Sequence, residues 1–408
     1  MYDAIIVGAR CAGSPTAMLL ARKGYKVLLV DRATFPSDTM STHHIQRHGV
    51  ERVARWGLLD RLLAIGGPRI TKWTFDVGPF ALSGNPTPAG DIDFDVCPRR
   101  TVLDKMLVDA AAEAGAEVRE DCSVTDLLQD ERGVYGIVGQ SASGRRHTER
   151  ARIVIGADGR NSLVAKSVGA PEYHTRASLT CGFYSYWSGI DLEGVELYPR
   201  EGNAVVAEET NDGLVYIAAG WHRGEFERVR GNLDACMRAA IQACAPSLAE
   251  RMADAVRVAP FKGTADFRFF FRRPFGPGWA LVGDAGYHRD AVTGQGIADA
   301  FRGADLQATA IDAGFRGCAP LETALAGHQS ERDEAVMPMY EFTYELAKLE
   351  PPTAEQQQLF AALRGNQPQI ERFLGVVAGT VSPRDFFSQA NVASIMRPRV
   401  TTELPLAA

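Results

Sequence analysis

Residues 1–31, MYDAIIVGARCAGSPTAMLLARKGYKVLLVD, decide the fold. A short apolar strand over 2–7 runs into a turn with Gly8 and Gly13, then a helix, and then a second strand that ends on Asp31. A βαβ unit of about 30 residues with this spacing is typical of dinucleotide binding. The N-terminus of such a helix presents free N–H groups and a partial positive charge to a pyrophosphate. A carboxylate about 20 residues further on is placed to bind a ribose.

Arg10 stands where the fingerprint G-x-G-x-x-G has its middle glycine. That glycine normally lets the backbone approach the phosphates. Either the backbone keeps the same path with the Arg10 side chain turned away, or the guanidinium itself contacts a phosphate. The sequence leaves both alternatives open.

Composition is that of an ordinary globular enzyme, with 46% hydrophobic and 23% charged residues among 408. This length suggests two or three structural units. The formal net charge of −6 gives no electrostatic footprint for nucleic acid. The seven cysteines show no CxxC spacing, so neither a metal site nor a disulfide framework is expected.

The N-terminus lacks the basic region of a signal peptide, and no apolar run reaches the ~18 residues that span a bilayer. We therefore expect a cytoplasmic protein without a transmembrane segment. The sequence does not indicate an oligomeric state.

Two later stretches also end a buried strand with small residues and one carboxylate. They are Ala157-Asp158-Gly159 and Gly283-Asp284-Ala285. Because ligands of parallel sheets lie at the carboxyl ends of the strands, these two stretches and the first one indicate a single extended ligand across one sheet edge.

In this order, the βαβ fingerprint, Arg100-x-x-Leu103, Ala157-Asp158-Gly159-x-x-Ser162, and Gly283-Asp284-Ala285 with Gly294-Gln295-Gly296 resemble FAD-dependent monooxygenases of the para-hydroxybenzoate hydroxylase type. The wider group includes geranylgeranyl-reductase-like flavoproteins and flavin-dependent halogenases. The resemblance covers about residues 1–330. It implies an α/β fold, with a Rossmann-like FAD-binding domain, an inserted antiparallel β-sheet substrate domain and a helical C-terminal segment. The expected ranges are 1–77, 96–175 and 272–335 for the FAD-binding domain, 78–95 and 176–271 for the substrate domain, and 336–408 for the C-terminal segment.

The resemblance also implies roles for single residues. Asp31 should hold the adenosine ribose, Arg100 should reach the pyrophosphate or ribityl region, and Asp284 should bind ribityl or ribose hydroxyls. Gly294 to Gly296 should lie against the isoalloxazine, where the following helix would place positive charge that stabilises the reduced ring. The expected FAD-binding residues are Gly8, Arg10, Cys11, Ala12, Gly13, Asp31, Arg32, Arg100, Asp158, Gly283, Asp284, Gly294, Gln295 and Gly296.

An alternating, aromatic stretch from Leu179 to Ile217 predicts an antiparallel sheet, and Phe267 to Phe271 is expected to be its last strand. This sheet is the expected roof over the flavin. His44 and His288 are candidate catalytic proton relays, because both adjoin loops assigned to the flavin. The expected substrate-pocket residues are Tyr184, Tyr186, Tyr216, Phe269 and Phe271.

The resemblance implies a monooxygenase that uses NAD(P)H and O₂ to oxygenate a small apolar or aromatic molecule through a flavin C4a-hydroperoxide. No second dinucleotide fold is evident, so NAD(P)H is expected to act as a transient electron donor, and NADH and NADPH both stay open. A reductase or dehydrogenase of the geranylgeranyl-reductase type is the main alternative. A halogenase, whose Trp-x-Trp-x-Ile-Pro signature is absent here, and a non-catalytic flavoprotein are further alternatives.

Overall fold

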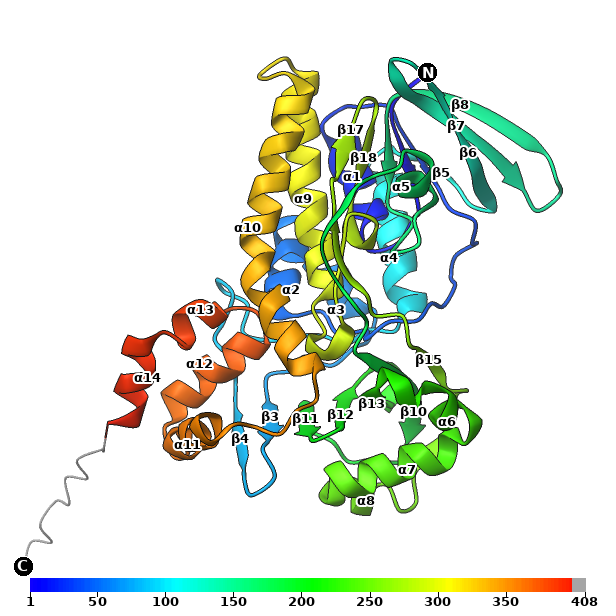
Figure 1. The fold of residues 1–408 in the computed structure, drawn as a ribbon. Coiled ribbons are helices and arrows are strands. Elements are labelled where there is room, and N and C mark those ends of the chain that lie inside the picture. Colours follow the sequence, from blue (N-terminus) through cyan, green and yellow to red (C-terminus); the bar gives the residue numbers. More distant parts are fainter. Residues whose placement is uncertain (398–408) are drawn as a thin grey trace, which may run out of the picture.

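The computed structural model describes residues 1–397 and contains three β-sheets with helices packed around them (Figure 1). The chain begins with the predicted βαβ unit. Strand β1 (Tyr2–Val7) pairs in parallel with β2 (Val27–Val30), and helix α1 (Gly13–Arg22) connects the two. The centre of β1 is apolar and fully buried, because the sheet is covered on both faces.

Strand β1 lies in the middle of an eight-stranded sheet. Strand β8 (Arg146–Gly156) pairs in parallel with β1 on the side opposite β2, and β18 (Trp279–Leu281) pairs in parallel with β8. Strand β5 (Glu117–Arg119) pairs in parallel with β2, and β17 (Phe275–Gly276) pairs antiparallel with β18. The carboxyl ends of β18, β8, β1 and β2 therefore lie at the same edge of the sheet.

A β-meander precedes and includes the first half of β8. Strand β6 (Cys122–Asp130) pairs antiparallel with β7 (Gly133–Ser141), and β7 pairs antiparallel with the first half of β8. The second half of β8 continues into the parallel sheet, so one long strand connects the meander to the cofactor-binding unit (Figure 1).

Helices cover the parallel sheet. Helix α1 packs against α4 (Arg100–Glu113) and α9 (Gly296–Phe315), and α10 (Leu321–Ala347) runs back beside α9 (Figure 1). Further helices on this part of the chain are α2 (Arg47–Arg55), α3 (Leu59–Ala64) and α5 (Leu163–Ser167).

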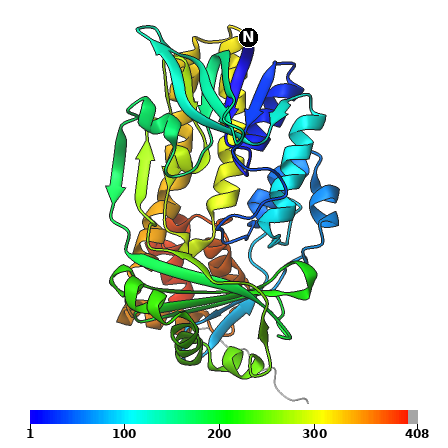
Figure 2. The same ribbon diagram turned by 90° about the vertical axis from the view of Figure 1, so that its right-hand side faces the viewer.

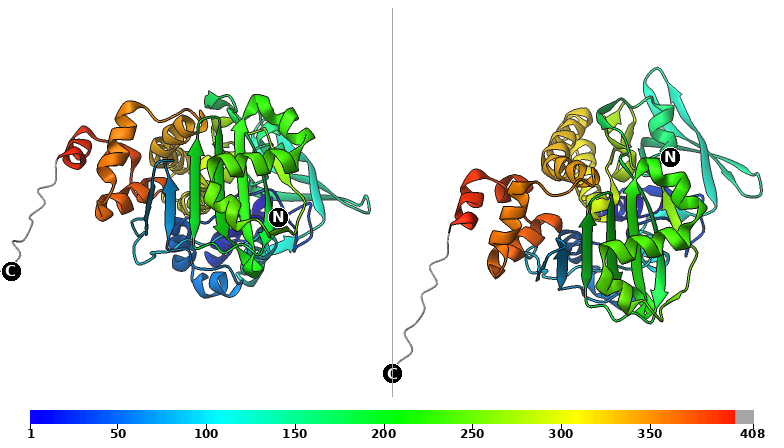
Figure 3. Two further views of the ribbon diagram at one scale, coloured as in Figure 1. Left: turned by 90° about the horizontal axis from the view of Figure 1, so that it is seen from below. Right: turned by 60° about the horizontal axis from the view of Figure 1, so that its bottom comes forward.

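The second sheet lies below the first in the view of Figure 2 and is mostly antiparallel. Helix α7 (Leu233–Cys244) crosses its outer face (Figure 3), flanked by α6 (Phe226–Gly231) and α8 (Pro246–Arg251). The strand order is β14 (Val256–Arg257), β10 (Thr180–Ser188), β13 (Val215–His222), β12 (Asn203–Glu209), β11 (Val195–Arg200), β3 (Trp73–Asp76) and β4 (Ala81–Gly84), with β15 (Lys262–Thr264) also paired to β10.

The substrate-domain sheet begins earlier in the chain than the expected boundary between residues 77 and 78. Strand β3 lies ahead of that boundary, yet it pairs in parallel with β11 and antiparallel with β4. The Gly- and Pro-rich stretch over 78–93 contains β4, which is the return strand of a hairpin with β3.

The expectation that 267–271 forms the last strand of the large sheet is wrong. Strand β16 (Phe269–Arg272) pairs instead with β9 (Glu172–Arg176) and β19 (Tyr287–His288) in a separate three-stranded sheet. All four residues of β16 are buried, because the strand is covered on one side by α10.

The expected C-terminal helical segment, 336–408, begins inside α10, and its residues 398–408 lie outside the described residues. Its helices pack against β3, β4 and β11 through an apolar cluster around Phe373 and Phe386. Within residues 1–397, no helix has both the length and the apolar character that crossing a membrane requires. The remaining helices are α11 (Ala354–Leu363), α12 (Gln367–Val377), α13 (Pro383–Phe386) and α14 (Gln389–Met396).

Candidate active site

A cavity of about 830 Å³ lies between the carboxyl edge of the parallel sheet, the N-terminus of α9 and the inner face of the large antiparallel sheet. The ends of β1, β8 and β18 contribute Gly8, Asp158 and Asp284 to its wall, and Asp31 follows the end of β2. The three carboxyl-ended stretches that the sequence singled out therefore meet in one cavity, because their strands are neighbours in the sheet.

The turn after β1 has no room for side chains at its glycines. Gly8 has φ +106°, and a Cβ there would lie 2.5 Å from the backbone oxygen of Ala157. A Cβ at Gly13 would lie only 1.7 Å from the backbone oxygen of Gly8. The turn and the first residue of α1 are thus held at contact distance, with the helix N-terminus beside the cavity.

Arg10 is bound by protein groups in this structure. Its guanidinium lies 2.5 Å from the carboxylate of Asp104 and 2.9 Å from the hydroxyl of Ser37, and stacks over Phe35 at 5.3 Å. The same buried Asp104 accepts hydrogen bonds from Arg100 at 2.9 and 3.0 Å. One carboxylate therefore fixes two arginines that both line the cavity.

The three carboxylates at the strand ends have different surroundings. Asp31 accepts hydrogen bonds from the backbone N–H groups of Ala9 (2.7 Å) and Ala33 (2.8 Å), so it ties two turns together. Asp158 caps α5 by accepting from the N–H of Leu163 at 2.6 Å. Burial raises the pKa of Asp158 although these hydrogen bonds oppose the shift.

Asp284 differs from the other carboxylates because its carboxylate is exposed to the cavity and has no hydrogen-bond or ion-pair partner among residues 1–397. At the start of α9, Gly294 has φ +63° and Gly296 has no atom within 4 Å of where its Cβ would be. A free carboxylate, an open helix N-terminus and two arginines at a crowded glycine turn fit the hydroxyls, ring and pyrophosphate of FAD.

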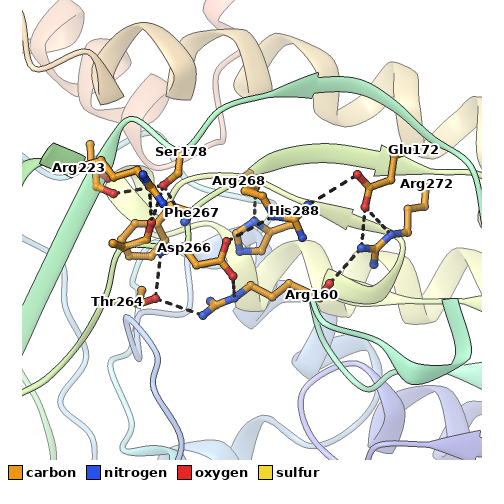
Figure 4. A network of polar contacts seen from close by, with 12 residues as sticks. Arg160, Glu172, Ser178, Arg223, Thr264, Asp266, Phe267, Arg268, Arg272 and His288 are labelled. Carbon is orange, nitrogen blue, oxygen red and sulfur yellow. Dashed lines mark hydrogen bonds and ion pairs between the residues drawn. The ribbon is translucent and has the colours of Figure 1, made fainter. Parts of the chain in front are cut away.

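His44 and His288, the two candidate proton relays, both line the cavity, on different sides. His288 stacks on Phe270, and its Nδ1 lies 2.6 Å from the backbone oxygen of Arg268 (Figure 4). Because a carbonyl oxygen can only accept, Nδ1 carries a hydrogen and donates a hydrogen bond to this oxygen. The surrounding network pairs arginines with carboxylates: Arg160 with Asp266, Arg268 with Glu172 and Asp266, and Arg272 with Glu172 (Figure 4).

His44 is paired with Glu208, a residue that the sequence analysis missed. Nδ1 of His44 lies 2.7 Å from Oε2 of Glu208, and both side chains are buried. Burial alone would lower the pKa of His44, but the Glu208 carboxylate raises it. The sequence offers no signal for Glu208, because residues 204–207 are all apolar and Glu208 and Glu209 are adjacent, so only the strand register shows which of the two faces the cavity.

The pKa of the neighbouring His43 is shifted in the opposite direction. Its Nε2 lies 2.6 Å from the hydroxyl of Tyr186, and its ring contacts Tyr184, Tyr186 and Tyr216. Burial lowers the pKa of His43 to about 3, so this histidine is neutral. His43 packs against all three tyrosine rings and fixes their positions.

All but five of the residues expected at the cofactor, substrate and proton-relay positions line the cavity. Tyr186 is turned toward His43, Gln295 donates to the backbone oxygen of Val377 at 2.9 Å, and Gly13 lies behind the turn. Phe269 and Phe271, expected in the substrate pocket, pack against Tyr340 on α10 instead, because β16 belongs to the small sheet. The expected residues that line the cavity are Gly8, Arg10, Cys11, Ala12, Asp31, Arg32, His44, Arg100, Asp158, Tyr184, Tyr216, Gly283, Asp284, His288, Gly294 and Gly296.

Asp290 is a second cavity residue that the sequence analysis did not select. It precedes the 3₁₀ turn η4 (Ala291–Thr293), accepts from the N–H of Val292 at 3.0 Å and accepts from the hydroxyl of Thr180 at 2.5 Å. Burial raises the pKa of Asp290 to about 6.

We expect this carboxyl group to make stability fall as the pH rises. An unfolded aspartate has a pKa of about 4, so between pH 4 and 6 the folded state binds more protons than the unfolded state. The free energy of unfolding should therefore decrease by about 1 to 2 kcal/mol from pH 5 to pH 8 through this group. Asp290→Asn keeps the side-chain shape and should remove that part of the pH dependence. Urea titrations of both proteins at the two pH values test this, and an unchanged pH dependence in the variant contradicts it.

The fold and the cavity define a Rossmann-type flavoprotein. Residues 1–230 match the family model described as FAD binding domain, which is more than half of the chain. The protein belongs to this family of FAD-dependent oxidoreductases.

Three similar proteins represent three chemistries. The chain is 29% identical over 311 residues to digeranylgeranylglycerophospholipid reductase 2 of Methanopyrus kandleri, covering 72% of this chain and 73% of the relative. It is 29% identical over 184 residues to 2,4-dichlorophenol 6-monooxygenase of Delftia acidovorans, covering 41% of this chain and 31% of the relative. The solved structure of the flavin-dependent brominase Bmp2 shares the fold, with a TM-score of 0.80 and 18% identity over 97% of each chain. The curated relatives also include a tryptophan 2-halogenase of Chondromyces crocatus, 25% identical over 80% of this chain. This chain is thus an FAD-binding flavoprotein of a superfamily that includes monooxygenases, reductases and halogenases.

Proposed function

We propose that the protein is a monooxygenase that uses NAD(P)H and O₂ to oxygenate a small apolar or aromatic molecule. The observation that carries this proposal is the continuity of the cavity. The same space touches the strand ends of the FAD-binding unit and the apolar and aromatic inner face of the large sheet, including Tyr184 and Tyr216. An apolar substrate on that face would lie next to the loop before α9.

The residues of this chain would bind FAD and orient it toward the substrate. Asp284 would accept hydrogen bonds from ribityl or ribose hydroxyls, Arg100 would face the pyrophosphate or ribityl region, and Gly294 and Gly296 would leave room for the flavin ring. When bound, FAD supplies the two-electron and oxygen chemistry. The N-terminus of α9 places positive partial charge at that loop, which stabilises negative charge on a ring beside it. His44, which is buried, would limit the access of water to this part of the cavity.

Turnover under ¹⁸O₂ tests the proposal. The FAD-loaded protein should oxidise NADH or NADPH faster in the presence of a small apolar aromatic compound, and one ¹⁸O atom should enter the product. A matched anaerobic reaction should reduce the flavin without forming product.

A flavin-dependent reductase is the second candidate, favoured by the similarity to the Methanopyrus kandleri protein over 72% of this chain. The same experiment separates the two. Saturation of a carbon–carbon double bond under anaerobic conditions, with no ¹⁸O in any product, contradicts the monooxygenase proposal and supports the reductase.

A further inference from the structure

The inner face of the large sheet carries one acid in a row of aromatic and apolar side chains. Directly paired residues of neighbouring strands stand on the same face of a sheet. The register pairs Tyr186 with Tyr216, Tyr216 with Glu208, Glu208 with Val195, and Val195 with Trp73. Glu208 thus stands alone as a carboxylate in the middle of this row.

The adjacent row on the same face consists of smaller residues. Tyr184 pairs with Ala218, Ala218 with Val206, and Val206 with Leu197. The three apolar side chains line the cavity and are only half-buried. In the next row along these strands Ala204 pairs with Gly220, so the side chains there are also small. This row forms an apolar floor, which we define as Ala218, Val206 and Leu197.

His44 covers Glu208 at the end of this floor nearest the flavin loop. Its ring lines the cavity, packs edge-on against Trp73 at 5.3 Å, and uses Nδ1 for Glu208. Nε2 is buried and has no hydrogen-bond partner within residues 1–397. A Cβ at Gly294 would lie 3.8 Å from the Cβ of His44, so the base of the His44 side chain adjoins the loop proposed to face the isoalloxazine.

A buried ring nitrogen without a hydrogen-bond partner costs free energy. A ligand that supplies a partner removes this cost and therefore binds more tightly. Burial would lower the pKa of His44, but the Glu208 carboxylate raises it. Because Nδ1 already faces Glu208 at 2.7 Å, Nε2 is the ring nitrogen left to pair with a ligand oxygen. A negatively charged head group would add a second buried anion beside Glu208, whereas an uncharged oxygen would not.

We propose that this face selects elongated apolar substrates that carry one uncharged oxygen head group. The oxygen forms a hydrogen bond with Nε2 of His44, and the apolar body lies on Ala218, Val206 and Leu197. His44 and Glu208 are then specificity-determining residues. The proposal rests on the proposed function only in that substrate and FAD share the cavity.

Binding of four probes to the FAD-loaded, oxidised protein tests the head group and the body separately. We expect 4-phenylphenol to bind at least about tenfold more tightly than 4-phenylbenzoate, biphenyl or phenol, as measured by calorimetry and by the perturbation of flavin absorbance. The first comparison changes the charge of the head, the second removes the head, and the third removes the distal ring. Equal or tighter binding of 4-phenylbenzoate, or equal binding of biphenyl, overturns the proposal, as does the absence of binding by every probe.

Substitutions test whether His44 and Glu208 cause the head-group preference. Glu208→Gln and His44→Asn should weaken 4-phenylphenol about tenfold and leave biphenyl unchanged, because biphenyl has no head group. Glu209→Gln is the matched control, since Glu209 adjoins Glu208 on the opposite face of β12 and accepts from the N–H of Gly194. Val206→Phe should weaken 4-phenylphenol but not phenol.

Equal losses for 4-phenylphenol and biphenyl in the Glu208 and His44 variants would show a purely structural role and contradict the assignment. If His44→Asn does not retain FAD, the isosteric Glu208→Gln and the wild-type comparison of head groups still decide. No turnover is measured, so failure here leaves the ¹⁸O₂ experiment unaffected. A negative ¹⁸O₂ result likewise leaves the binding preferences standing.

Discussion

Gly13→Ala is expected to abolish FAD binding and to destabilise the protein by at least about 3 kcal/mol. The added Cβ would lie 1.7 Å from the backbone oxygen of Gly8 and 3.1 Å from the Cβ of Ala157. Neither neighbour is the far end of a flexible side chain, so α1 must move away from the end of β1. That movement opens the turn that would hold the pyrophosphate and displaces the helix N-terminus. The flavin absorbance of the purified protein and its urea midpoint are the measurements.

Gly327→Ala is the matched control for this prediction. Gly327 is an exposed residue of α10, and a Cβ there would meet no atom within 4 Å. The same substitution should leave FAD content unchanged and stabilise the helix by up to about 1 kcal/mol. A Gly13→Ala protein that is as yellow and as stable as the control would contradict the crowded packing of the first turn.

Asp95→Asn should lower the free energy of unfolding by about 3 to 5 kcal/mol. Asp95 and Arg47 form an ion pair at 2.8 Å in which both side chains have no solvent exposure. Asp95 also accepts hydrogen bonds from the backbone N–H of Arg47 (2.5 Å) and from the indole N–H of Trp73 (2.8 Å). The substitution leaves the Arg47 guanidinium buried without its counter-charge. It also loosens Trp73, which packs on His44, so probe binding should weaken as well.

Asp93 supplies the comparison for this second prediction, because it is exposed and lies two residues earlier in the chain. Asp93→Asn should change stability by no more than about 0.5 kcal/mol. Urea titrations at neutral pH compare the two variants with the wild type. Similar small effects of both substitutions would mean that Asp95 does not hold α2 and β3 together through Arg47 and Trp73.

The cofactor-binding half of the molecule was predictable because its signals are local. The strand, turn and helix over residues 1–31 follow from apolar runs and two glycines, and both glycines are required at the observed contact distances. The later stretches around Asp158 and Asp284 were each weak, yet their order matched one family, and the structure brings them to one cavity. Arg10 was left open, since only the position of Asp104 on α4 shows which group binds its guanidinium.

The substrate side of the cavity was less predictable because its contacts join distant parts of the chain. Alternation marked the aromatic residues but did not show which strand pairs with which. Phe269 and Phe271 therefore looked like pocket residues, although β16 pairs with β9 and β19 and packs them on α10. Strand β3 was likewise assigned to the wrong unit, since its partner β11 lies more than 100 residues further on.

The sequence by itself determined that this chain folds around a dinucleotide-binding βαβ unit and belongs with FAD-dependent oxidoreductases. A short glycine turn allows few backbone paths, so its residues report its structure directly. Only the tertiary structure paired His44 with Glu208, which are 164 residues apart, and left Nε2 without a partner above an apolar floor. Strand register and side-chain burial decide such pairs, and both arise when the sheets pack together.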